Sequence, residues 1–310
     1  MFYRFFLFFL FVLFFDLTSD VPAKAYTASD AHTAEAELWG KQPEEEKAFE
    51  TAGLFFSDKP EEVPIRENTP LWLENAISEP EAQEDSPMIA IVIDDLGINR
   101  KTTEAVLELP APITAAFLAY ADDLPQQTEK ARSNGHELLL HVPMEPANPH
   151  FDPGPGALRT DLTADDIREK LDIMLEAFDG YVGINNHMGS KFTSDRKAVG
   201  TVIDELKKRN LLFLDSMTSG ESFGWKQARD RNVPYAVRDV FLDNARDEKE
   251  IMKQLALVEK QALKHHIAVA IGHPHAATVR ALSKWMPQAK EKGFVFVPVS
   301  SVALIGQEDY

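Results

Sequence analysis

The sequence contains no cysteine among its 310 residues. This absence excludes disulfide bonds, thiolate metal sites and cysteine nucleophiles. A metal ion bound by this chain must therefore use histidine, aspartate or glutamate ligands, and a hydrolytic nucleophile must be water or a hydroxyl group.

Phosphate-binding motifs and excess positive charge are also missing. No G-x-G-x-x-G follows the first predicted strand and no P-loop lysine motif is present, which argues against the common nucleotide-binding folds. The chain has 32 Lys and Arg against 50 Asp and Glu, a net charge of −18. This balance leaves no basic surface of the kind that binds nucleic acid, and we expect no nucleic-acid partner.

Long hydrophobic runs are confined to the N-terminus. After Arg4, residues 5–15 form an unbroken apolar stretch, which is too short to cross a bilayer as a helix but suits the hydrophobic region of a secretory signal. Residues 23–25, Ala-Lys-Ala, resemble a cleavage site. We therefore expect residues 1–25 to be a signal peptide that exports the protein to the periplasm or the medium. An uncleaved signal that anchors the chain is the alternative.

The segment after the signal is acidic. Residues 26–87 contain 16 Asp or Glu and 4 Lys or Arg, a net charge of −12, together with scattered prolines. This composition predicts a disordered linker. Two apolar stretches interrupt it, at residues 48–56 and 70–77, and they are either docking patches or incidental interruptions.

From residue 88 to residue 306 the sequence alternates between apolar runs and amphipathic stretches. Predicted strands cover 88–93, 113–118, 137–141, 181–185, 211–215, 235–240, 267–272 and 294–299. Predicted helices cover 99–109, 124–133, 163–178, 195–210, 247–266 and 277–292. Such alternation predicts a parallel α/β sheet, and seven or eight units favour closure into a (β/α) barrel. An open doubly wound sheet is the alternative.

Polar side chains gather where the predicted strands end. They are Asp94, Asp95, His141, Glu145, Asn185, Asn186, His187, Asp215, Ser216, His273 and His275. A single Asp or His at a strand end is usually a cap or a structural hydrogen-bonding group. In a barrel, however, the carboxyl ends of the strands share one rim, where active sites are built. The convergence of five strand ends therefore indicates a functional site.

Metal chemistry accounts for the composition of this rim. Imidazole and carboxylate ligands suit Zn²⁺, and catalytic zinc sites use three protein ligands and keep one position open. One acid of the Asp94–Asp95 pair would bind the metal, whose charge relieves the repulsion between the two carboxylates. The other acid would take a proton from water, and an imidazole on the opposite side would protonate the leaving amine.

Five motifs resemble one known family. They are IVIDDLG (91–97), NGHELLLHVPMEP (134–146), NNHMGS (185–190), FLDS (213–216) and IGHPH (271–275). In this order they resemble the divergent polysaccharide deacetylases, a branch of the NodB-like carbohydrate esterases. The resemblance implies a distorted (β/α) barrel of seven or eight mostly parallel strands, a divalent metal that is usually zinc, and an acetylated glycan substrate, with peptidoglycan as one candidate.

The resemblance also implies roles for individual residues. Asp94 would be the general base, Asp95 a metal ligand, His141 the first metal histidine and His273 the general acid. The wider pattern has a second metal histidine four residues after the first, but Glu145 stands at that place in this chain.

The remaining metal ligand is therefore open. Glu145 would either bind the metal or mark a turn between two prolines, and His187, on the neighbouring predicted strand, is the alternative ligand. Asp215 would orient His273. His275 is a second candidate for the acid or for a ligand.

Two functions remain under these expectations. The first is an exported metal-dependent hydrolase that removes acetyl groups from a cell-envelope polysaccharide. The second is a catalytically impaired barrel that binds a glycan or an envelope protein. The missing second histidine, the missing arginine–proline–proline–tyrosine segment of the superfamily and the acidic linker, which would recruit the protein partner, favour the second.

Overall fold

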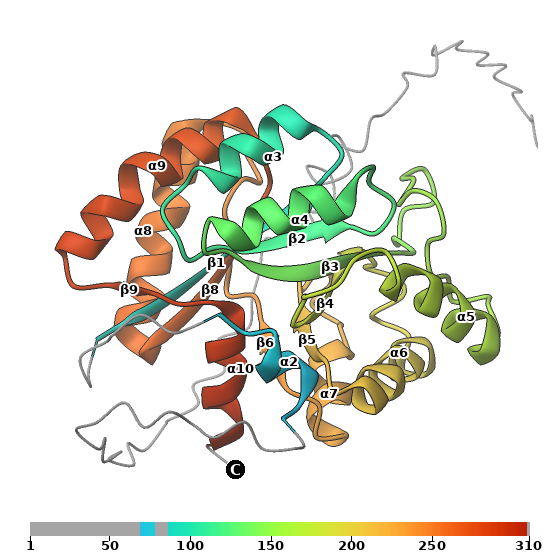
Figure 1. The fold of residues 1–310 in the computed structure, drawn as a ribbon. Helices are drawn as coiled ribbons and strands as arrows, with labels where there is room; N and C mark the ends of the chain where they lie inside the picture. Colours follow the sequence, from blue (N-terminus) through green and yellow to red (C-terminus); the bar gives the residue numbers. More distant parts are fainter. Residues whose placement is uncertain (1–68, 78–85, 309–310) are drawn as a thin grey trace, which may run out of the picture.

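The computed structural model describes residues 69–77 and 86–308, and Figure 1 shows their arrangement. The predicted signal peptide and most of the predicted acidic linker lie outside these residues. No helix in the described ranges combines the length and the apolar character that a bilayer crossing requires.

A single curled, parallel sheet forms the centre of the molecule. Its strands are β1 (Met88–Leu96), β2 (Thr114–Leu118), β3 (Glu137–Met144), β4 (Gly183–Met188), β5 (Leu212–Asp215), β6 (Tyr235–Val237), β7 (Val240–Phe241), β8 (Ile267–Gly272) and β9 (Val295–Phe296). The order is β6-β5-β4-β3-β2-β1-β8-β7, with β9 paired to β1. The predicted distorted (β/α) barrel is confirmed.

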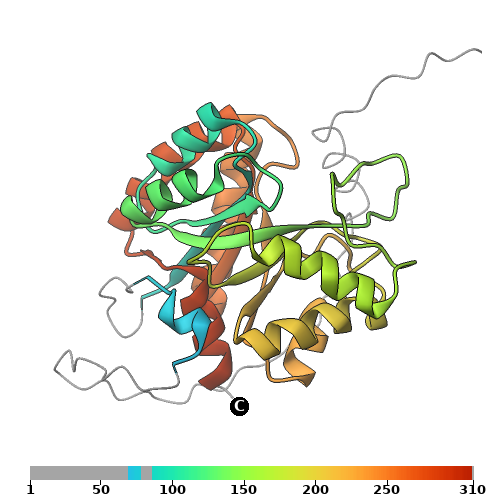
Figure 2. The same ribbon diagram turned by 45° about the vertical axis from the view of Figure 1, so that its right-hand side comes forward.

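The helices follow the strands in the order expected for strand–helix alternation (Figures 1 and 2). They are α3 (Arg100–Leu107), α4 (Leu124–Ser133), α5 (Ala164–Leu175), α6 (Arg196–Arg209), α7 (Gly224–Asp230), α8 (Glu248–His265), α9 (Ala276–Glu291) and α10 (Val299–Glu308). Local caps define several of their starts. Thr163 and Asp166 form a complete capping box at α5, and the Asp195 and Asp247 side chains cap α6 and α8, which satisfies amide groups that the helix cannot pair.

One predicted strand is in fact two. The segment 235–240 forms β6 at one edge of the sheet and β7 at the other, with only residues 238 and 239 between them. Because so short a connection spans only about 10 Å, the two edges lie close together and the chain itself closes the barrel. Arg238 donates from Nε to the Ser216 carbonyl at 2.7 Å, and Asp239 accepts the Val269 amide at 2.7 Å.

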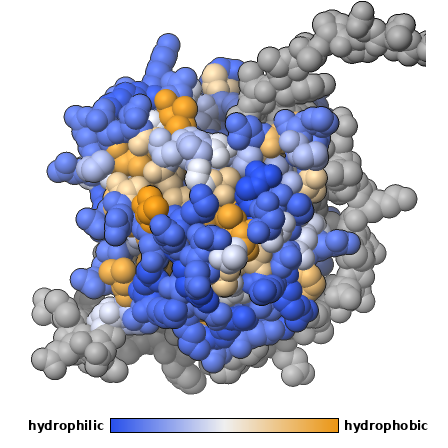
Figure 3. Space-filling model, turned by 90° about the vertical axis from the view of Figure 1, so that its right-hand side faces the viewer, coloured by the Kyte–Doolittle hydropathy of each residue, from blue (hydrophilic) through white to orange (hydrophobic). Residues whose placement is uncertain are grey.

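Two apolar layers follow from the alternation of side chains along each strand. The outer layer packs the sheet against the helices and includes Ile89, Ile91 and Ile93 of β1. The inner layer fills the barrel and includes Ala90 and Val92. Figure 3 shows the side on which α5 and α6 lie, where hydrophilic residues dominate and hydrophobic ones are interspersed.

A short helix outside the predicted barrel closes its amino-terminal end. The sequence places α2 (Leu71–Glu74) in the linker, but in the structure the Trp72 side chain is buried in the inner layer with Val299 and Ala303 of α10. The Trp72 amide donates to the Asn210 carbonyl at 3.0 Å, just before β5. The indole fills the bottom of the barrel, where the small inner side chains leave room.

We expect Trp72→Ala to lower the free energy of unfolding by about 3 kcal/mol, because burying a Trp contributes roughly this much and the vacated space lies in a packed interior. Urea unfolding of the full chain measures the loss. Leu73→Ala on the same helix is the control, since Leu73 is 37% exposed. Equal losses in the two variants would contradict the docking of the indole.

A buried acid also lies at this end of the barrel. Glu137, at the start of β3, accepts hydrogen bonds from the Thr114 hydroxyl at 3.2 Å and the Ser300 amide at 3.1 Å, and a further one from the Ser300 hydroxyl. Burial raises the pKa of Glu137 from 4.5 to about 7, although these hydrogen bonds oppose the shift. The acid therefore joins β3 to the start of α10 and prefers its protonated form.

A raised carboxyl pKa makes folding stability fall as pH rises. The contribution is complete below the unfolded value of 4.5 and is lost as pH rises through about 7, a change of about 3 kcal/mol at 1.36 kcal/mol per unit. We expect Glu137→Gln to be more stable than the parent protein at pH 8 but not at pH 4.5. Urea unfolding at both pH values measures the difference. The exposed Glu129→Gln should show no such trend. The prediction would be contradicted if the free energy of unfolding of Glu137→Gln differed from that of the parent protein by the same amount at both pH values.

Candidate metal centre

The two adjacent acids at the end of β1 both face the site because the strand is irregular there. Successive residues of a regular strand point to opposite faces, but the β1–β2 register shifts between Ile93 and Leu96, and Asp95 has a left-handed φ of 59°. Asp tolerates this conformation better than most residues. Gly97 completes the turn with φ of 100°, where a Cβ would lie 2.6 Å from that of Ala121.

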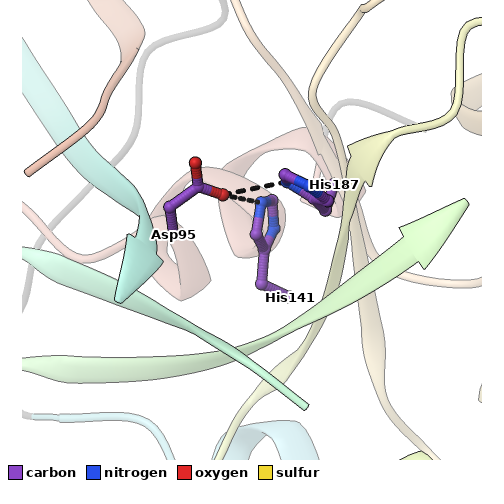
Figure 4. Close-up of side chains that lie close together, drawn as sticks. All are labelled: Asp95, His141 and His187. Carbon is purple, nitrogen blue, oxygen red and sulfur yellow. Dashed lines mark ion pairs between the residues drawn. The ribbon is translucent and has the colours of Figure 1, made fainter. Parts of the chain in front are cut away.

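Three side chains from three strands converge beside this turn. Figure 4 shows the Asp95 carboxylate pointing toward His141 of β3 and His187 of β4. Asp95 Oδ1 lies 2.9 Å from His187 Nδ1 and 3.3 Å from His141 Nε2. All three offer ligand atoms within 4.8 Å of one another. This is a nitrogen, nitrogen, oxygen donor set, which suits Zn²⁺.

The surroundings of His141 favour a cation at this point. Its Nε2 is buried and faces two carboxylates, with Asp95 Oδ1 at 3.3 Å and Asp94 Oδ2 at 3.7 Å. Burial alone would lower the pKa of His141, but the negative charges of Asp94 and Asp95 outweigh burial and raise it. Positive charge is therefore stabilised where the three ligand atoms meet, and the residues fit a divalent metal.

A candidate base and a candidate acid flank the three ligands. Asp94 is buried, and its Oδ2 lies 3.7 Å from His141 Nε2. His273 follows β8, and its Nε2 lies 4.0 Å from Asp95 Oδ2. The sequence predicts these two residues for the proton-transfer roles, and the structure places each of them within 4.0 Å of one of the candidate ligands.

Asp243, not Asp215, orients His273. Asp243 Oδ1 lies 2.9 Å from His273 Nδ1, and its Oδ2 accepts the His273 amide at 2.6 Å and the Thr278 hydroxyl at 2.7 Å. Burial would lower the pKa of His273, but the Asp243 charge and hydrogen bond raise it to about 9. His273 is therefore protonated near neutral pH, with Nε2 directed toward the site.

The structure thus corrects the role assigned to Asp215. That side chain accepts from the Ser222 hydroxyl at 2.7 Å and the Trp225 amide at 3.0 Å, under α7. Successive side chains of a strand point to opposite faces. Leu214 lies in the inner layer, so Asp215, the next residue, faces outward toward the helices. The sequence contains a second Phe-Leu-Asp motif at residues 241–243, and Asp243 follows β7 directly. This motif is the sequence feature from which the acid that orients His273 could have been identified.

Glu145 is not part of the metal cluster in the structure. Its Oε2 accepts the amide and hydroxyl of Thr160 at 2.8 and 2.7 Å, and its Oε1 accepts Lys191 Nζ at 2.8 Å. Burial would raise the pKa of Glu145, but these partners lower it to about 2. Glu145 therefore fixes the loop between β3 and α5, and His187, not Glu145, joins Asp95 and His141 as the third candidate ligand.

His275 belongs to a second group of possible ligands with Asp243 and His273. The Asp243 oxygens, however, already bind His273 and Thr278, and the His275 ring stacks on His273 with centroids 5.8 Å apart. His275 also precedes α9 as its first flanking residue. This group is better explained as support for His273 than as a metal site.

Comparison with known proteins relates this chain to a family. A family model described as divergent polysaccharide deacetylase matches residues 91–303. The uncharacterized protein YibQ of Escherichia coli K12 is 36% identical to this chain over 196 residues, which are 63% of this chain. An uncharacterized protein of Haemophilus influenzae is 31% identical over 194 residues, which are 63% of this chain and 69% of that protein. The match spans only 61% of YibQ. The crystal structure of an uncharacterized Agrobacterium tumefaciens C58 protein superposes with a TM-score of 0.72 at 29% identity, covering 74% of this chain and 94% of that one.

Proposed function

The chain belongs to the divergent polysaccharide deacetylase family, and on this premise we propose that it is an exported, zinc-dependent hydrolase that removes acetyl groups from a cell-envelope polysaccharide. The convergence of Asp95, His141 and His187, with Asp94 and His273 beside them, is the observation that carries the proposal. The predicted signal peptide supports export, and the family supports a glycan substrate.

The residues divide the chemistry in a defined way. Asp95, His141 and His187 would hold a divalent cation, which would supply Lewis acidity and make a water molecule easier to deprotonate. Asp94 accepts a proton from the attacking water, because its carboxylate is buried close to His141. His273 donates a proton from Nε2 to the leaving amine or hydroxyl group.

Asp243 prepares His273 for that step. The carboxylate accepts from Nδ1, which fixes the proton to be transferred on Nε2, and its negative charge stabilises the imidazolium before the transfer. Asp243 raises the pKa of His273, which favours the protonated form, the form that can donate a proton.

Acetate release tests the proposal. The purified full chain, loaded with zinc, is incubated with N-acetylglucosamine oligosaccharides, peptidoglycan and an O-acetylated glycan. We expect release from at least one of them, loss of release with a chelator and recovery when zinc is restored. Release that survives chelation would overturn the metal mechanism. Glycan binding without any acetate release would instead support the binding protein as the function.

A further inference from the structure

Asn185 lies between the candidate metal ligand and the candidate base. It is fully buried on β4 and is the direct register partner of His141 on β3. Asn185 Oδ1 lies 2.8 Å from His141 Nδ1, and Nδ2 donates to Asp94 Oδ1 at 2.8 Å. A third contact, from Nδ2 to the Ser216 hydroxyl, is 3.2 Å. One amide therefore touches both functional groups at once.

The chemistry of the partners fixes which way this amide faces. An ionised carboxylate can only accept hydrogen bonds, so the side of Asn185 beside Asp94 must be the NH₂ group. The carbonyl oxygen then faces His141, and the imidazole nitrogen beside it must carry a proton in order to donate. With that proton on Nδ1, the lone pair of neutral His141 lies on Nε2, which points toward Asp95 at 3.3 Å.

We propose that Asn185 is the positioning residue that sets the metal-binding tautomer of His141 and holds Asp94 in place as the base. The proposal rests on the proposed function, since it assigns a supporting residue to that site. Partners behind a metal histidine fix its ring and tautomer, and losing one typically weakens metal binding by 10- to 100-fold. Here the same side chain also reaches the base, so the two roles respond differently to different substitutions.

Two variants separate the roles. Asn185→Asp keeps an oxygen that accepts from His141, but it replaces the group that donates to Asp94 by a second carboxylate oxygen, which repels the Asp94 carboxylate. Asn185→Ala removes both. The zinc dissociation constant, measured by competition with a chromophoric chelator, reports on His141 independently of turnover, and acetate release reports on Asp94.

Asn186→Ala is the matched control. Asn186 is the next residue of the same strand and is equally buried, but it points to the other face, where Nδ2 donates to the Met188 carbonyl at 2.7 Å and Oδ1 accepts the Ser216 amide at 3.0 Å. It loses a comparable buried amide without touching His141 or Asp94.

We expect Asn185→Ala to bind zinc about 10- to 100-fold more weakly. Asn185→Asp should bind zinc no more weakly than the parent protein, because a carboxylate behind His141 also accepts its Nδ1 proton and raises the basicity of the ligand. Asn186→Ala should remain within about threefold of the parent protein, because Asn186 contacts neither His141 nor Asp94. Acetate release by zinc-loaded Asn185→Asp should fall by about 100-fold or more. Weak zinc binding in Asn185→Asp, or parental binding in Asn185→Ala, would overturn the inference.

The same measurements distinguish this inference from the proposed function. If Asn185→Ala does not fold, Asn185→Asp alone decides, because parental zinc affinity combined with lost turnover is an outcome that simple unfolding does not give. Parental turnover in Asn185→Asp would overturn the inference while leaving the function intact. A parent protein that binds no zinc would overturn both.

Discussion

Replacing both His141 and His187 by alanine should produce a folded barrel that no longer holds zinc. The double change leaves only Asp95 of the three candidate ligands, whereas zinc sites that keep an open position rely on three protein ligands. Elemental analysis after dialysis should show about one zinc per chain in the parent protein and essentially none in the variant. Acetate release should disappear with the metal.

The matched control removes two histidines from the surface. His150 and His265 are exposed and lie outside the metal cluster, so His150→Ala combined with His265→Ala should keep the zinc of the parent protein. Thermal unfolding of all three proteins establishes that the barrel remains folded. Zinc retained by the His141 and His187 double variant would mean that the metal binds elsewhere.

Replacing Asp94 by asparagine should abolish turnover and leave zinc bound. Asparagine has the same shape and can still accept from Asn185 Nδ2 through its carbonyl oxygen, but it cannot take a proton from water. General bases contribute about 10²- to 10⁴-fold to rates, so acetate release should fall by at least 100-fold with the metal content unchanged.

The neighbouring acid provides the contrast. Asp95→Asn makes the same chemical change one residue later, but it weakens a metal ligand, so zinc content and turnover should fall together. Elemental analysis and acetate release on both variants measure the two patterns. Equal zinc loss in the two variants, or substantial turnover in Asp94→Asn, would contradict the separate roles of Asp94 and Asp95.

The parts of the fold that could be predicted from the sequence depend on local patterns. Apolar runs and amphipathic periods identify strands and helices because burial on one face sets their spacing. The capping box at Thr163 identifies the start of α5. The site could also be predicted from the sequence, because the carboxyl ends of parallel strands meet at one rim and His141 and His187 lie on the neighbouring strands β3 and β4.

What could not be predicted depends on backbone irregularity and on partners distant in sequence. Both acids of the pair face the candidate metal position because Asp95 adopts a left-handed backbone conformation. No pattern of residues in the sequence predicts that conformation. Alternation decides that Asp215 faces outward while Asp243 reaches His273. Glu145 matched a ligand position by spacing, but its partners Thr160 and Lys191 lie in other segments.

Both ends of the described chain lie on the amino-terminal side of the barrel. Trp72 is packed there beside α10, while the metal centre lies at the carboxyl ends of the strands (Figure 1). Any attachment made through residues before 69, to a membrane, a partner or a bead, therefore joins the barrel at its amino-terminal end and leaves the metal centre at the opposite end uncovered by residues 69–77.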